Sequence, residues 1–230
     1  MLGVDSIGII IKYPYNIQQM VTYDKGEIVM CRQLIKEIRQ LDKSINGMPE
    51  CADHILQYFN ITEDMPTPIV YIMQQMGIVA LRGSFSTQGL SAYIAVNAEY
   101  REKYGSNKIA CVNEKESLGH QRFALAHELA HYLFDYDEIN NSTYYNTYFI
   151  DENGDDNSTN ANYNRDGINI ECRANKFAAE LLMPKELFKR KYKDFQEIYK
   201  NKNATIDALS QFFEVSRTAI ERRIVEVGKN

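Results

Sequence analysis

The clearest chemical signal in the chain is a His-Glu-x-x-His sequence, in which His127 and His131 enclose Glu128. In a helix, residues four apart lie on one face, with Cβ atoms roughly 5–6 Å apart. Two imidazoles at that spacing can bind one zinc ion, each at about 2.0–2.1 Å. The carboxylate of Glu128 can then face a water molecule on the ion and take its proton. The sequence therefore predicts a hydrolytic zinc centre with Glu128 as general base.

A helix that carries these residues by chance is the competing interpretation. The chain has only four histidines, so an accidental pair at this spacing with a glutamate between them is improbable. The surrounding residues are mostly apolar, which indicates a largely buried helix: Phe123, Ala124, Ala126, Leu129, Ala130, Leu133 and Phe134. Buried imidazoles and carboxylates need a partner, and a metal ion would be one.

The third metal ligand has to come from outside the motif. Metzincins continue with a glycine and a further histidine, where this chain has Phe134 and Asp137. A carboxylate on the later helix expected at 171–183 is the alternative. Glu171 extends the apolar face of that helix, whereas Glu180 lies about 180° around it. We therefore expect Glu171 to be the third ligand.

Other acidic residues remain candidates for that ligand, namely Asp137, Glu138 and Glu180. One helical turn after Glu171, the amide of Asn175 could hydrogen-bond a ligand histidine from the second coordination layer. Its alternative role is that of a solvated amide at the edge of the helix.

The elements that position these residues can be predicted from apolar spacing. Expected helices are Ile28–Leu41, Asp53–Phe59, Ile69–Met76, Leu118–Phe134, Glu171–Met183, one that Pro184 opens and that runs to about Tyr192, Ile206–Phe213 and Ser216–Val227. Expected strands are Ile78–Leu81, Leu90–Val96 and Lys108–Val112, with further strand-like stretches at Ile7–Ile11 and Tyr144–Ile150. Sequential strands with short links predict a small, mostly antiparallel sheet.

The fold class is therefore α+β. Hydrophobic residues make up 44% of the 230 residues, enough for a sizeable core, and the net charge of −5 argues against non-specific nucleic-acid binding as the main activity. We expect a mainly helical extension over 1–67, a core over 68–195 with a long loop excursion at 135–167, and a helical subdomain over 196–230.

The cysteines and the N-terminus indicate the cellular compartment of the protein. The four cysteines lie far apart and form no CxxC pair, which argues against a structural cysteine–zinc site and a disulfide framework. The sequence shows neither a signal-peptide pattern nor a long apolar run. These features predict a cytoplasmic protein without membrane contact.

The two C-terminal helices resemble a helix-turn-helix over 206–227. Three basic residues of the second helix could contact phosphates, namely Arg217, Arg222 and Arg223. Glu221 and Glu226 alternate with them, which favours packing on the core or docking of a partner protein. Weak DNA contact is the alternative.

Two segments together resemble the ImmA/IrrE family of metallopeptidases. The first runs from Arg122 to His131, and the second is Glu171-Cys-Arg-Ala-Asn-Lys-Phe-Ala-Ala-Glu-Leu-Leu-Met-Pro184. Their pairing is more specific than HExxH alone, and the resemblance covers about Pro68 to Pro184 well and the C-terminal tail loosely. It implies a zincin-like core of helices beside a small sheet, zinc as cofactor, and Glu171 as the carboxylate ligand. The excursion between the segments is longer than the family leads us to expect.

Members of this family often act as antirepressors. The resemblance thus implies a zinc-dependent intracellular endopeptidase whose protein substrate is a transcriptional repressor or other regulatory protein of a mobile element or stress locus. The alternative is a non-proteolytic regulator that binds a repressor or DNA and keeps the zinc site for structure. A structural zinc site is closed by four protein ligands, whereas a catalytic one keeps a water position.

Overall fold

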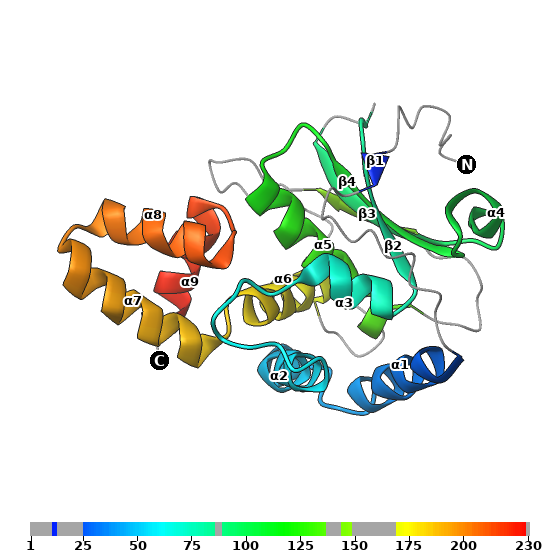
Figure 1. Ribbon diagram of the computed structural model, residues 1–230, viewed down its shortest axis with the longest axis horizontal. Helices are drawn as coiled ribbons and strands as arrows, with labels where there is room; N and C mark the ends of the chain where they lie inside the picture. The colour runs from blue at the N-terminus through cyan, green and yellow to red at the C-terminus, as the bar shows by residue number, and fades with distance from the viewer. Residues whose placement is uncertain (1–10, 13–24, 86–88, 137–143, 149–168, 229–230) are drawn as a thin grey trace.

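The fold is a mixed α+β arrangement in which helices cover a small sheet (Figure 1). The computed structural model describes residues 11–12, 25–85, 89–136, 144–148 and 169–228. Within them, α5 lies against the sheet, α3 and α6 lie beside α5, and α7 to α9 form a group at one end (Figure 1). The predicted α+β class is confirmed.

The sheet has the order β1-β2-β4-β3-β5 in the described residues. The strands are β1 Ile11–Lys12, β2 Ile78–Gly83, β3 Leu90–Val96, β4 Lys108–Asn113 and β5 Tyr144–Tyr148. Three pairs are antiparallel, as predicted, but β2 and β4 are parallel. β4 therefore lies between two strands that are neighbours in sequence. Crossing one strand takes only about 10 Å, which the short link between β2 and β3 can cover.

The helices follow the predicted pattern, most of them with shifted ends. They are α1 Lys25–Ile38, α2 Met48–Tyr58, α3 Ile69–Gln75, α4 Tyr100–Tyr104, α5 Leu118–Phe134, α6 Ile170–Leu182, α7 Lys185–Tyr199, α8 Lys202–Phe213 and α9 Arg217–Gly228, with a 3-10 turn at Ile45–Gly47. The prediction for α7 was wrong at its end, because the ring of Phe195 packs against Phe212, 6.2 Å away, and extends the buried face. α8 begins earlier than predicted because Asn201 caps it, accepting from Ala204 N at 3.1 Å.

Two apolar clusters lie on opposite faces of the sheet. Successive side chains of a strand alternate between faces, so in β3 Ile94 joins the main core under α5, whereas Tyr93 joins a smaller cluster. Tyr100 and Tyr104 of α4, an element the sequence did not predict, cover that smaller cluster. The main core extends through α2, α3, α5, α6 and into α8 and α9.

Both helices that carry the predicted metal ligands are capped by side chains. Ser117 Oγ accepts from His120 N at 3.3 Å at the start of α5, and Asn169 Oδ1 accepts from Cys172 N at 3.0 Å at the start of α6. At the end of α5, Arg39 donates to the carbonyls of Leu133 and Tyr132 at 2.9 and 3.1 Å. A cation at a helix C-terminus also stabilises the helix dipole.

The strand-like residues 7–10 and the predicted strand end at 149–150 lie outside the described residues, as does nearly all of the 135–167 excursion. In the described part of the chain, no helix has both the length and the apolar character that a membrane span requires. The division into segments 1–67, 68–195 and 196–230 stays a prediction.

Candidate metal centre

Two neighbouring helices bring the three predicted ligands together. His127 Nε2 lies 2.9 Å from His131 Nε2, and both belong to α5. Glu171, in the first turn of α6, places Oε2 3.1 Å from His127 Nε2 and 3.6 Å from His131 Nε2. Both histidine side chains are buried, while the glutamate side chain is 33% exposed. One imidazole pair and one carboxylate thus converge at the edge of the core.

The opposite ring nitrogens are held by oxygen atoms. His127 Nδ1 lies 2.9 Å from Asn175 Oδ1, and His131 Nδ1 lies 2.9 Å from Asp135 Oδ2. Amide and carboxylate oxygens only accept hydrogen bonds, so each Nδ1 carries the proton and donates it. In the neutral rings the lone pairs are then on the two Nε2 atoms, which face each other and Glu171.

This donor set fits a zinc ion. Three ligand atoms that each lie about 2.0–2.1 Å from one tetrahedral ion are roughly 3.3 Å apart, and the three separations of 2.9, 3.1 and 3.6 Å enclose that value. Two lone pairs and a carboxylate at these distances repel one another unless a cation or a proton lies among them. The group of His127, His131 and Glu171 is therefore a candidate metal site.

Comparison with known families identifies the chain. The family model described as the IrrE N-terminal-like domain matches residues 73–225. The chain belongs to this family of zinc metallopeptidases. The match confirms the resemblance predicted from the two motifs and reaches beyond Pro184 into α9. A comparison of the peptidase with curated proteins gave no match.

The ionisable side chains of the peptidase site change one another's pKa values. Burial alone would raise the pKa of Glu171, but hydrogen bonds with His127 and His131 outweigh it and hold the pKa well below its ordinary value. Burial alone would lower the pKa of His131, but hydrogen bonds with Asp135 and Glu171 and the charge of Glu128 raise it to about 9. Burial lowers the pKa of His127. The site thus attracts one positive charge, which a proton or a metal cation can supply.

Glu128 directly follows His127 in α5. Its side chain is fully buried, and its charge contributes to the raised pKa of His131. It is not one of the three converging donors. The carboxylate is thus near the ligands without being one of them.

The other candidates for the third ligand do not join the cluster within the described residues. Glu180, on the far side of α6, pairs with Arg223 and Lys176 instead. Asp137 and Glu138 lie outside the described residues. Asp135 was missed as a partner of the site, although its position four residues after His131 places it on the same helix face.

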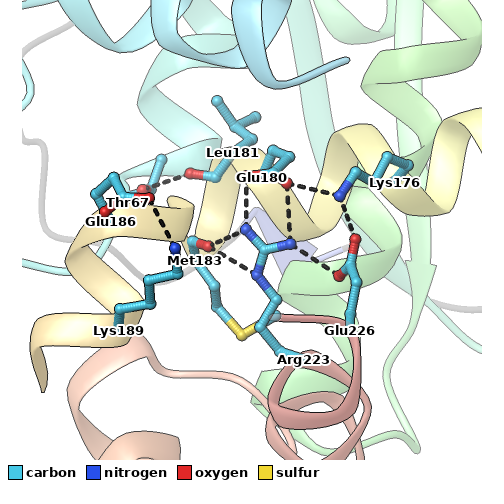
Figure 2. Close-up of polar contacts among 9 residues, drawn as sticks. All are labelled: Thr67, Lys176, Glu180, Leu181, Met183, Glu186, Lys189, Arg223 and Glu226. Atoms are coloured by element: carbon cyan, nitrogen blue, oxygen red, sulfur yellow. Dashed lines mark hydrogen bonds and ion pairs between the residues drawn. The ribbon is translucent and has the colours of Figure 1, made fainter. Parts of the chain in front are cut away.

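Two of the three C-terminal arginines pair with acidic side chains of the protein itself. Arg223 is buried against Glu180, Glu226 and the carbonyl of Met183 (Figure 2). Its predicted availability for phosphates is therefore wrong, because the guanidinium points into the interface with α6. Arg217 pairs with Asp207, and Arg222 is exposed. These contacts favour the packing interpretation of α8 and α9.

Proposed function

We propose that this peptidase hydrolyses peptide bonds inside a protein substrate, with zinc held by His127, His131 and Glu171 and with Glu128 as the base. The observation that carries the proposal is the convergence of both Nε2 atoms and one Glu171 oxygen within 3.6 Å, beside a buried glutamate. When bound, zinc would acidify a water molecule and polarise the carbonyl of the scissile peptide bond.

Three further residues contribute to the proposed reaction beside the metal ligands. Asn175 and Asp135 keep the proton on the Nδ1 atoms, so that the Nε2 lone pairs are available to the metal. Glu128 takes a proton from the attacking water molecule on a carboxylate oxygen and then delivers it to the nitrogen of the amine that leaves, as a general base and acid do in turn. Burial of Glu128 removes water that would compete for that proton.

Three protein donors favour catalysis over a purely structural role for the metal. Within the described residues the cluster has three members, and catalytic zinc sites use three protein ligands where structural sites use four. A catalytic site also gives a role to the buried glutamate adjacent to the first ligand, which can act as the base. A non-proteolytic regulator remains the competing function, and it predicts a metal site without turnover.

The proposed substrate is a transcriptional repressor or another regulatory protein, with the peptidase acting as an antirepressor. This part of the proposal comes from the family resemblance. An intracellular place of action is consistent with the four cysteines, which are all free thiols.

The test is incubation of the purified peptidase with the repressor encoded beside its gene, with and without a metal chelator. The expected result is one or a few defined fragments, lost with chelator and restored by zinc. Zinc content is measured on the same sample. Bound zinc without cleavage of the repressor or of any unfolded protein would favour the non-proteolytic regulator.

A further inference from the structure

Asp135 is placed to control one of the candidate ligands. Its side chain is 6% exposed, and Oδ2 accepts from Nδ1 of His131, whose side chain is 1% exposed. The residue ends α5 as its C-cap. A buried carboxylate at a helix C-terminus is unfavourable, because the helix dipole is negative there. Something else must therefore stabilise this charge.

Arg173 provides the stabilising charge. Its side chain is 1% exposed, and Nη2 contacts Asp135 Oδ1, the oxygen that does not accept from His131. The guanidinium also donates to Lys43 O at 3.4 Å and lies over the ring of Phe134, 5.4 Å from its centre. These contacts hold the guanidinium at the end of α5.

We propose that Asp135 and Arg173 form a positioning pair that fixes the orientation and tautomer of His131 for metal binding. The inference rests on the proposed metal site. The two carboxylate oxygens act differently, because Oδ1 pairs with Arg173 while Oδ2 orients the imidazole. Without the arginine, the carboxylate could rotate away from Nδ1 or compete for the metal itself.

The pair also links the two ligand helices. Arg173 lies two residues after Glu171 in α6, whereas Asp135 lies four residues after His131, at the C-cap of α5. Their contact therefore fixes the distance between the helix that carries two ligands and the helix that carries the third. Lys43 precedes the segment 73–225 that the family match covers, so the N-terminal part of this chain supports its metal site.

A second buried arginine offers a matched control. Arg223 is likewise 1% exposed and pairs with a buried carboxylate of α6, Glu180, at 2.5 Å (Figure 2). It contacts none of the three candidate ligands in the interactions that the structure describes. Replacing Arg173 or Arg223 by glutamine removes one buried positive charge in either case. Only Arg173, however, pairs with the carboxylate that accepts from His131.

The experiment measures zinc affinity of the full chain by competition with a chromophoric chelator, together with the visible spectrum of the cobalt-substituted protein. D135A is expected to weaken zinc binding 10–100-fold, the usual effect of removing such a partner. D135N, which keeps an acceptor oxygen, should weaken it less. R173Q should weaken binding and shift the cobalt bands, while R223Q should lower the melting temperature and leave both metal readouts unchanged.

The double variant D135N/R173Q tests whether Arg173 acts through Asp135. Its zinc affinity should equal that of D135N, because the arginine has lost its charged target. If R173Q fails to fold, R173K takes its place and should bind zinc with an affinity between wild type and D135A.

A zinc affinity of D135A within twofold of wild type would contradict the role of the Asp135–Arg173 pair, but not the zinc site itself. Equal weakening by R173Q and R223Q would also contradict that role. A wild-type chain that binds no zinc would overturn the metal site as well.

Discussion

Glu128 and the histidines beside it differ in what their removal should do. His127 and His131 direct their Nε2 atoms at a common point, whereas Glu128 lies outside the converging group. The two kinds of residue can therefore be separated by measuring metal content and turnover on the same variants.

For Glu128→Gln we expect zinc content equal to wild type and a loss of cleavage of about 10²–10⁴-fold, the usual contribution of a general base. Glutamine has nearly the same shape but cannot take the proton. Metal analysis and cleavage of the repressor are the measurements. Cleavage within tenfold of wild type would remove Glu128 from the mechanism.

A second comparison uses the two glutamates of α6. Glu171→Gln should lose most bound zinc, because the carboxylate that faces both Nε2 atoms becomes neutral. Glu180→Gln removes a carboxylate from the same helix, yet Glu180 pairs with Arg223. That variant should keep its zinc and melt at a lower temperature. Equal zinc loss in both variants would contradict the assignment of Glu171.

At the scale of elements, α5 is held at both ends by segments far away in sequence. At its C-terminus Arg39, which directly follows α1, donates to the last carbonyls. Near its N-terminus Arg122 donates to Glu214 O at 3.0 Å and to Thr67 O at 2.7 Å. The turn between α8 and α9 packs so closely on α5 that a Cβ atom on Gly119 would lie 2.6 Å from the backbone carbon of Val215.

Gly119→Ala is therefore expected to destabilise the protein by about 1–3 kcal/mol, the typical cost of overpacking. Helix propensity alone would predict a gain of about 1 kcal/mol, but the added methyl group meets backbone atoms that cannot rotate away. Gly228→Ala at the end of α9 is the matched control, since nothing lies within 4 Å of its added Cβ. Thermal and urea denaturation measure both; a G119A protein as stable as G228A would show that the turn can move.

At the scale of the whole molecule, metal binding and folding should be linked. The ligands come from two helices that only the folded chain brings together, so zinc is expected to bind the native state and to stabilise it. At free zinc a thousandfold above the dissociation constant the gain is about 4 kcal/mol. The melting temperature should rise with zinc and fall with chelator. In E171Q the shift should be much smaller, and an equal shift there would point to another metal site.

The contact between the C-terminal helices and α6 should make the protein sensitive to acid. Burial alone would raise the pKa values of Glu180 and Glu226, but hydrogen bonds with Arg223 and Lys176 hold both below the ordinary 4.5. A lowered pKa in the folded state means that stability is present above about 4.5 and is lost as pH falls through the folded values. The pKa of nearby Asp53 is raised, by its burial and by the charge of Glu180, which opposes this trend in part.

Urea denaturation at a series of pH values measures this effect. The free energy of unfolding should decrease below about pH 4.5 in wild type, and the decrease should be smaller in R223Q, which lacks the cation that lowers both pKa values. At neutral pH, R223Q should cost about 3–5 kcal/mol, as removal of one partner of a buried ion pair does. Parallel curves for both proteins would contradict this origin of the acid sensitivity.

Local signals in the sequence were sufficient for most of the elements and for the motif, but not for α4. The bounds of α5 and β3 agree with the prediction because apolar spacing acts within a few residues. The assignment of Glu171 followed from helical geometry and from the family resemblance. The order of the strands did not follow, because a short link permits either a neighbouring or a skipped strand.

The sequence by itself therefore determined which reactive groups the protein has: two imidazoles one turn apart, a glutamate beside them, and a carboxylate on a later helix. Only the tertiary structure decided which distant groups support them. Asp135, Arg173 and Lys43, like Arg223 and Glu180, meet through the packing of α5, α6, α9 and the segment after α1. Such contacts join residues whose separation in sequence carries no periodic signal, and burial and charge pairing select them only once the chain is folded.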